Sequence, residues 1–244
     1  MDERTGDYDP AELAQLGFGT SKVPQFIVDA DWHILMASEG AGRLLERARE
    51  SLTGLPLERI HLPTTQQGYA AATAEIMAAG VTGFDTESKP TFAVGDVSEG
   101  PHVLQFALHD KAYLFQIHRM ECHPFLVELL RSPQLLKVGF GLRSDGKHIR
   151  SKLGIRPAAL VDLNQVFSKD GFQKEMGVRN AVAQMFGQRF IKSRKVTTSN
   201  WSLPELSAQQ MLYAANDAYA ALKVLEALHL PLEALPVMYA DQTD

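Results

Sequence analysis

The chain has 244 residues, 45% of them hydrophobic and 22% charged, a composition that excludes an intrinsically disordered protein. No apolar run reaches the roughly 18 residues of a membrane helix, the acidic start at residues 1–4 is not a secretory signal, and the single cysteine, Cys122, excludes an internal disulfide. We therefore expect an intracellular protein, cytoplasmic or, in a eukaryote, nuclear, that is not secreted and has no membrane partner.

The net charge of −5 is unevenly distributed along the chain. Residues 131–200 contain 14 Lys and Arg against 4 Asp and Glu, so this segment carries +10 and the remainder carries −15. A basic segment in an acidic protein favours a local surface for a polyanion such as a nucleic acid, with a solvated charged surface as the alternative.

The first sixty residues contain no motif that indicates chemistry. We predict that residues 1–22 are a flexible acidic leader and that residues 23–80 are an appendage of short strands and helices packed on the core. The appendage is predicted to contain a strand–turn–strand at 26–28 and 33–36 and a helix at 41–52. Thr64 or Thr65 is predicted to cap a second helix, which runs through 70–79 and stops at Gly80.

Residues 81–87 are predicted to form a strand that ends in Asp-x-Glu. Residues two apart on a strand point to the same face, so Asp85 and Glu87 would project side by side. Two neighbouring carboxylates repel each other, and hard oxygen ligands at this spacing suit Mg²⁺ or Mn²⁺. The simpler alternative is a pair of acids on a solvated strand face.

The following elements predict an α/β fold. An antiparallel meander comes first, and strand–helix–strand units follow it, which gives a mixed sheet flanked by helices. The predicted elements are strands at 102–108 and 112–118 joined by a tight turn, a helix at 124–130, a buried strand at 136–140, a helix from about 146 to 153, and a strand at 159–162.

The segment from Gly141 to His148 reads G-x-x-x-x-G-K-H between a strand and a helix. It falls one residue short of a phosphate-binding P-loop, because His148 replaces the Ser or Thr that would bind Mg²⁺. A nucleotide-binding P-loop protein is therefore one alternative. In the competing interpretation Asp145 is the working residue, at the carboxyl end of a strand, where open α/β sheets bind ligands. The simplest interpretation is that Asp145 serves only as a turn or N-cap residue.

Ser207 and Gln210 form a predicted capping box, which starts a helix that continues to about residue 228. Tyr213 and Asp217 are four residues apart and so lie on one face of this helix. Small neighbours at 214, 215, 218 and 220 would allow another element to approach closely. A buried hydrogen bond between the phenol and the carboxylate is the alternative to a functional pair.

Taken in order, Asp85-x-Glu87, Gly139-x5-Asp145 and Tyr213-x3-Asp217 resemble the three motifs of the DEDD superfamily of 3′–5′ exonucleases, in its tyrosine-bearing branch. The residues around each motif match as well, and Thr-Ser-Asn-Trp at 198–201 resembles a connection in the Werner-syndrome exonuclease domain and its relatives near RNase D. The similarity covers roughly residues 80–230. It implies a ribonuclease H-like fold with an exonuclease domain at 81–232, followed by a C-terminal tail at 233–244.

The resemblance also implies a mechanism with two divalent cations, Mg²⁺ or Mn²⁺, and no nucleotide cofactor. One cation would activate the attacking water and the other would stabilise the leaving 3′ oxygen. Asp85 would contact both cations, Glu87 and Asp217 would complete the site of the first, and Asp145 would hold the second. Tyr213, with an ordinary phenol pKa of about 10, would orient the attacking water.

The expected partner is a nucleic-acid strand with a free 3′ end, either DNA or RNA. Basic residues would contact the phosphates electrostatically, and Trp201 would either stack on a base or, more simply, fill the core. The candidate substrate-binding residues are Thr86, Lys147, His148, Lys192, Arg194, Lys195 and Trp201. A non-catalytic nucleic-acid-binding scaffold on the same fold is the second alternative, although it has no reason to keep four mutually repelling acids.

Overall fold

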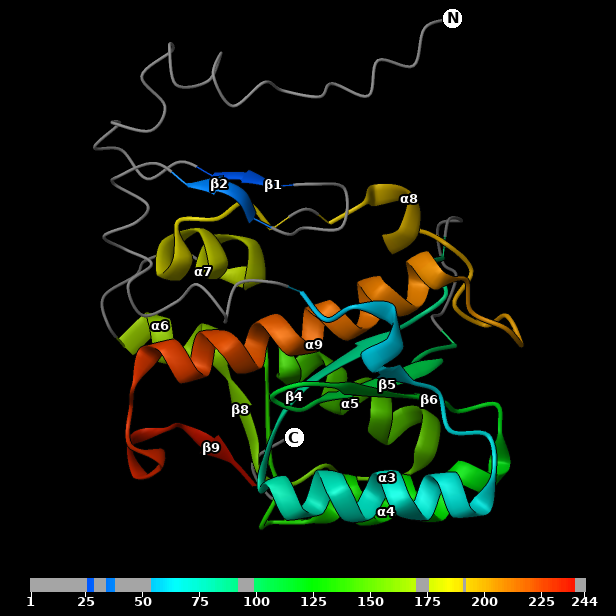
Figure 1. Ribbon diagram of the computed structural model, residues 1–244. Coiled ribbons are helices and arrows are strands. Elements are labelled where there is room, and N and C mark those ends of the chain that lie inside the picture. Colours follow the sequence, from blue (N-terminus) through cyan, green and yellow to red (C-terminus); the bar gives the residue numbers. More distant parts are fainter. Residues whose placement is uncertain are drawn as a thin grey trace, which may run out of the picture. The chain divides into compact units, whose positions relative to one another are not determined.

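A seven-stranded mixed sheet forms the centre of the computed structural model, which describes residues 26–28, 34–37, 54–91, 99–169, 176–190 and 192–239 (Figure 1). The strand order is β3-β6-β5-β4-β7-β8-β9. The strands are β3 (Ile60–His61), β4 (Val81–Glu87), β5 (Val103–Ala107), β6 (Ala112–Gln116), β7 (Leu136–Gly139), β8 (Leu160–Asp162) and β9 (Val237–Met238).

The directions of the strands confirm the predicted fold class. Strand β5 pairs antiparallel with both β4 and β6, and this is the predicted meander. Strand β7 lies parallel to β4 on one side and to β8 on the other, as the strand–helix–strand units require. At the edges, β3 is parallel to β6 and β9 is antiparallel to β8.

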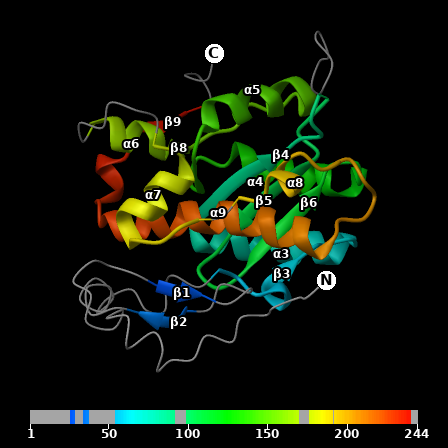
Figure 2. The ribbon, with the colours of Figure 1, turned by 90° about the horizontal axis from the view of Figure 1, so that it is seen from above.

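Helices cover both faces of the sheet (Figure 1). Helix α9 packs its alanines on one face, over side chains of β5 and β6, whereas α3 and α4 pack leucine, isoleucine and tyrosine on the other. Figure 2 shows α9 extended across the strands. The described helices are α3 (Gln66–Ala79), α4 (His123–Arg131), α5 (Leu142–Leu153), α6 (Leu163–Lys169), α7 (Gly177–Phe186), α8 (Arg194–Thr197) and α9 (Ala208–Leu228), with 3₁₀ turns η1 (Leu57–Arg59), η2 (Met120–Cys122) and η3 (Leu232–Ala234).

Two of the helix-start signals act as predicted. Thr65 caps α3 by accepting a hydrogen bond from the Gly68 amide at 3.1 Å, and Gly80 ends the helix with a φ of 69°. The helix therefore starts directly after one of the two predicted cap residues. Ser207 and Gln210 form the predicted capping box of α9.

Strands β1 (Phe26–Val28) and β2 (Ile34–Ala37) pair antiparallel, which confirms the two predicted strands. They belong to a compact unit separate from the one that contains the seven-stranded sheet. The predicted leader at 1–22 and the predicted helix at 41–52 lie outside the described residues. Within the described part of the chain, no helix combines the length and the apolarity that crossing a membrane requires.

The predicted domain boundaries stay predictions. The compact unit with the seven-stranded sheet starts at Leu55, and α3 contributes Tyr69 and Ile76 to its core. At the other end, β9 lies within the segment predicted to be a tail, and Met238 is buried in the same core.

Candidate functional site

Strand β4 presents Asp85 and Glu87 to the face of the sheet that α9 covers. Phe84 points to the opposite face, where it is fully buried among the side chains that pack against α3 and α4. The strict alternation of side chains along a strand therefore separates the two acids from the apolar core. Glu87 is 9% exposed, and Asp85 is half-buried.

Helix α9 brings Asp217 down onto β4 because the two backbones meet at Gly83. A Cβ atom at Gly83 would lie 2.0 Å from the carbonyl oxygen of Ala218, so only glycine fits there. Ala218 directly follows Asp217 in the chain. The close approach therefore sets the distance between Asp217 and the acids of β4.

The acids of the first and third motifs form one cluster. Asp85, Glu87 and Asp217 each offer a ligand atom, and these atoms lie within 4.8 Å of one another. Asp145 joins them through Thr86, whose hydroxyl donates a hydrogen bond to Asp145 Oδ1 at 2.5 Å and whose amide donates to Asp85 Oδ1 at 2.9 Å. The structure therefore brings together all four predicted acids, and it places the predicted substrate contact Thr86 between two of them.

Burial and mutual repulsion raise the pKa values of these carboxyl groups. Burial raises the pKa of Asp85, and burial together with the charges of Asp85 and Asp217 raises the pKa of Glu87 to about 10. Burial is also the main cause that raises the pKa values of Asp145 and Asp217 to about 7, and the Asp85 charge adds to it in both. Four ionised carboxylates are stable in such a place only beside positive charge.

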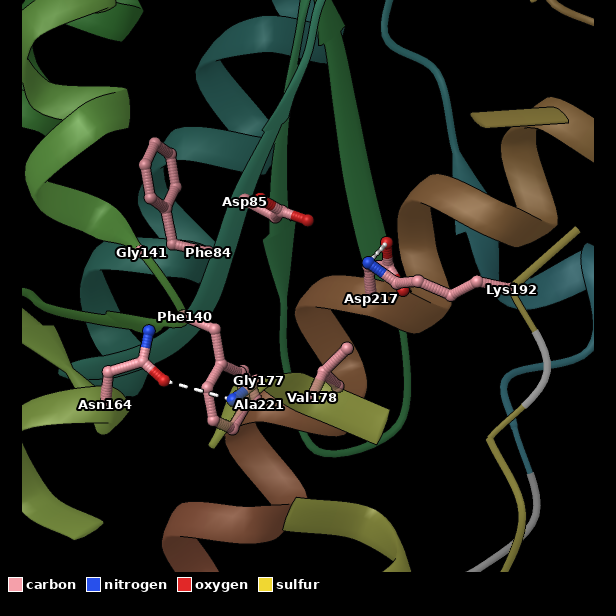
Figure 3. Close-up of a pocket in the computed structure, with 10 residues that line it drawn as sticks. All are labelled: Phe84, Asp85, Phe140, Gly141, Asn164, Gly177, Val178, Lys192, Asp217 and Ala221. Carbon is pink, nitrogen blue, oxygen red and sulfur yellow. Dashed lines mark hydrogen bonds and ion pairs between the residues drawn. The ribbon is translucent and has the colours of Figure 1, made fainter. Parts of the chain in front are cut away.

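Lys192 supplies positive charge at this point, which differs from its predicted role as a strand-binding residue. Its ammonium lies 2.6 Å from Asp217 Oδ2 (Figure 3) and 5.5 Å from the centre of the Tyr213 ring. This contact is an ion pair between a largely buried ammonium and a buried carboxylate. Burial lowers the pKa of Lys192, but the charges of Asp217 and Asp85 outweigh this effect and hold the pKa above its usual value.

Tyr213 lies one turn before Asp217 on α9, as predicted, but its pKa is not ordinary. Burial and the Asp217 charge raise the pKa of Tyr213 to about 12, so the phenol stays protonated at neutral pH. Its oxygen accepts a hydrogen bond from the Thr197 hydroxyl at 2.9 Å, and the phenol in turn donates a hydrogen bond to Asp217. Sequence reasoning did not identify Thr197, because its partner lies sixteen residues away on another helix.

The remaining predicted substrate contacts fall into two groups. Lys147 and His148 are exposed on α5, and Arg194 and Lys195 are exposed on α8. Trp201 is only 1% exposed, within a cluster of apolar side chains under α9, so its ring has no free face on which a base could stack. The structure fits the alternative in which this tryptophan fills the core.

The P-loop alternative is wrong because its loop is a helix. Helix α5 starts at Leu142, right after Gly141, and not near residue 146 as predicted. Residues 142–148 are therefore helical and do not form the loop that a P-loop wraps around a phosphate. Asp162, the acid of the neighbouring strand, accepts hydrogen bonds from the Gly141 and Asn164 amides, both at 3.0 Å, and thereby holds the two turns in place.

A cavity of about 250 Å³ adjoins the acidic cluster (Figure 3). Asp85, Asp217 and Lys192 lie at one side of it, and Asn164 Oδ1 accepts a hydrogen bond from the Gly177 amide at 3.1 Å at another. Its lining residues are Phe84, Asp85, Phe140, Gly141, Asn164, Gly177, Val178, Lys192, Asp217 and Ala221. The site thus combines clustered carboxylates with space for a ligand.

Comparison with known proteins identifies similarity to 3′–5′ exonucleases. A family model described as 3′–5′ exonuclease matches residues 60–233. The bifunctional 3′–5′ exonuclease/ATP-dependent helicase WRN of Mus musculus is 30% identical over 150 residues. That match spans 61% of this chain and 11% of the mouse protein, so the chain corresponds to a small part of this relative.

Solved structures show the same fold at low sequence identity. The Nibbler EXO domain of Aedes aegypti has a TM-score of 0.61 at 21% identity, covering 71% of this chain and 88% of that one. RNase D of Trypanosoma brucei, solved in complex with RNA U12, has a TM-score of 0.64 at 17% identity, covering 83% of this chain and 69% of that one.

Proposed function

We propose that this chain, which belongs to the 3′–5′ exonuclease family, hydrolyses the terminal phosphodiester bond at the 3′ end of a nucleic-acid strand and releases nucleoside monophosphates. The observation that carries the proposal is the gathering of Asp85, Glu87 and Asp217 within 4.8 Å of one another. The match to RNase D, which was solved with a bound RNA, supports a nucleic acid as the substrate class.

The cluster fits divalent cations. Both oxygens of Asp217 are buried, and the Lys192 ammonium, 2.6 Å from Oδ2, already places a positive charge beside them. Carboxylates with free lone pairs are the ligands that Mg²⁺ and Mn²⁺ prefer. Asp85, Glu87, Asp145 and Asp217 would hold the cations. Two such ions, when bound, would activate a water and stabilise the negative charge that develops on the leaving 3′ oxygen.

The other residues of the site would orient the reactants. The protonated phenol of Tyr213 would hold the attacking water, because Thr197 fixes its oxygen and its proton faces the acidic cluster at Asp217. Thr86 would keep Asp145 in place through the hydroxyl contact. The exposed cations of α5 and α8 would bind the sugar–phosphate backbone electrostatically.

The cavity beside Asp85 and Asp217 would receive the terminal nucleotide. Its wall contains Phe140 and Val178, which are apolar, and the polar side chain of Asn164. A binding site that combines apolar surface with a few polar groups is typical for a small organic ligand. The scissile phosphate would then lie next to the carboxylates.

A strand labelled at its 3′ end tests the proposal. With Mg²⁺ or Mn²⁺ the protein should release labelled mononucleotides from DNA, from RNA or from both. A blocked 3′ end should stop the reaction, and a blocked 5′ end should not. Asp85→Ala and Asp217→Ala should abolish release, whereas Glu205→Gln, which removes an exposed acid, should leave it unchanged.

The same assay separates the proposal from its alternative. Binding of the strand without cleavage, under every metal condition, would identify a nucleic-acid-binding scaffold on the nuclease fold. Cleavage that persists in Asp85→Ala or in the presence of EDTA would contradict the proposed mechanism.

A further inference from the structure

The side chain of Gln105 is fully buried and has no hydrogen-bond partner in the part of the chain that the structure describes. Its exposed fraction is 0%, and neither the amide nitrogen nor the amide oxygen is paired. A buried amide of this kind destabilises a fold, because it gives up its hydrogen bonds to water without replacing them. A buried, unpaired amide at this position therefore indicates a role other than stabilising the fold.

Gln105 lies directly beside the acidic cluster. It is the antiparallel partner of Asp85, on β5 next to β4, and opposite residues of such a pair point to the same face of the sheet. Its own neighbours on that face, Val103 and Ala107, pack against the alanines of α9. The amide is therefore enclosed beneath α9, in the layer that also holds Asp85 and Asp217.

That layer also contains the carboxylate of Asp217, which the Lys192 ammonium contacts at 2.6 Å in the metal-free structure. Both carboxylate oxygens of Asp217 are buried, and a bound cation that displaces Lys192 would leave this carboxylate in need of another donor. The amide of Gln105 carries two N–H donors, adds no charge to a cluster of four acids, and leaves the second lone pair of each oxygen available. Donors of this type commonly fix the orientation of metal-binding carboxylates.

We propose that Gln105 is a positioning residue of the cation site, and that its Nε2 group donates a hydrogen bond to Asp217 when the site is loaded. The inference rests on the proposed function, since it assumes that Asp217 binds a cation. Gln105 does not touch the substrate in this account. It acts through Asp217, whose carboxylate it holds beside Asp85.

A purely structural role makes a different prediction. Gln116 on β6 lies diagonally across from Gln105 on the same face, and its Oε1 atom is also buried and unpaired among the described residues. Its Nε2 atom donates to the Leu203 carbonyl at 3.0 Å. If Gln105 served only to pair with Gln116, the two residues would affect stability together and neither would affect cation binding.

Replacement by methionine, which preserves the length of the side chain, separates the two roles. Mn²⁺ binding to the protein is measured directly, without substrate, in the wild type, Gln105→Met and the matched control Gln116→Met. We expect Gln105→Met to weaken Mn²⁺ binding about 10-fold. We also expect its metal-free melting temperature to stay level or rise by about 2–4 °C, because an unpaired amide is removed. Gln116→Met should bind Mn²⁺ like the wild type.

Turnover adds a second readout. In Gln105→Met a lowered kcat should recover at high Mn²⁺ concentration, while KM for the strand stays unchanged. The inference about Gln105 would be overturned if Gln105→Met bound Mn²⁺ as tightly as the wild type, or if Gln116→Met weakened binding equally. If Asp85→Ala abolishes Mn²⁺ binding in the same experiment, the proposed function stays intact in either case. A wild-type protein that binds no Mn²⁺ would instead overturn the proposed function.

Discussion

A Cβ atom on Gly83 would lie 2.0 Å from the carbonyl oxygen of Ala218, so strand β4 and helix α9 meet backbone against backbone. This contact lies two residues before Asp85 on the strand and one residue after Asp217 on the helix. It fixes the separation of two carboxylates that come from distant parts of the sequence. The geometry of the candidate site therefore depends on a residue that carries no functional group.

Gly83→Ala should damage both stability and cation binding. The added methyl group must push α9 away from β4, which costs about 1–3 kcal/mol in the free energy of unfolding and displaces Asp217 from Asp85. Urea unfolding and direct Mn²⁺ titration measure the two effects.

The matched control for this variant is Gly146→Ala. The same methyl group there meets only the Leu160 side chain at 3.6 Å, an ordinary contact, and it lies inside helix α5. It should leave stability unchanged or raise it by about 0.5–1 kcal/mol. Similar losses in the two variants would show that the approach of α9 to Gly83 is not the cause.

Lys192→Met should make the protein depend more strongly on metal. The ammonium that pairs with Asp217 at 2.6 Å is removed, which leaves buried negative charge without a partner. Because 25% of the Lys192 side chain is exposed, we expect a loss of about 1–3 kcal/mol without metal, less than for a fully buried pair. Saturating Mn²⁺ should restore most of it, as thermal unfolding with and without the ion would show.

Lys195→Met is the control for this experiment, because Lys195 lies exposed on the neighbouring helix α8. Its stability should differ from that of the wild type by less than about 0.5 kcal/mol under both conditions. If the gain in melting temperature on adding Mn²⁺ were the same in Lys192→Met and the wild type, Lys192 would not compete with the cation for Asp217.

Tyr213→Phe should lower kcat by about 10²-fold and leave Mn²⁺ binding intact. The variant keeps the aromatic ring and removes only the hydroxyl that would orient the attacking water. Thr197→Val, which deletes the donor to that hydroxyl, should have a smaller effect of the same kind. An unchanged kcat in Tyr213→Phe would exclude the phenol from the reaction.

Asp145→Asn should change how stability depends on pH. Burial and the Asp85 charge raise the pKa of Asp145 from 3.8 to about 7 in the folded protein, so between these values the folded state binds the proton more tightly than the unfolded state. Stability contributed by this group is present below pH 4 and is lost as the pH rises through 7. The asparagine keeps an acceptor for the Thr86 hydroxyl and does not titrate.

Unfolding in EDTA at pH 5 and pH 8 measures this effect. Relative to Asp145→Asn, the free energy of unfolding of the wild type should fall by on the order of 2 kcal/mol between the two pH values. Added Mn²⁺ should reverse the loss at pH 8, because the ionised carboxylate is the form that binds a cation. A difference between the two proteins that does not vary with pH would contradict the raised pKa.

The sequence was sufficient for features whose signals are local. The meander of β4 to β6, the cap at Thr65, the left-handed Gly80 and the capping box at Ser207 each depend on residues within a few positions. The ordered motifs also placed Asp85, Asp145 and Asp217 in one site, because each motif sits at a defined place in the fold.

Features that arise from tertiary contacts were not predictable in the same way. Helix α5 starts at Leu142 because Asp162, some twenty residues away, holds the Gly141 amide. Lys192 pairs with an acid twenty-five residues further on, so its charge alone suggested phosphate instead. The roles of Gly83 and Gln105 depend on α9 lying over them, which no local pattern reports.

The most direct test of the account is the position of bound Mn²⁺ in crystals of the protein, located by anomalous scattering. We expect density between the carboxylates of Asp85, Glu87 and Asp217, with Asp145 facing a second ion and Lys192 moved away from Asp217. Mn²⁺ found only elsewhere on the protein, or an ion pair between Lys192 and Asp217 that stays intact at saturating Mn²⁺, would contradict the claim that these acids form a cation-dependent nuclease site.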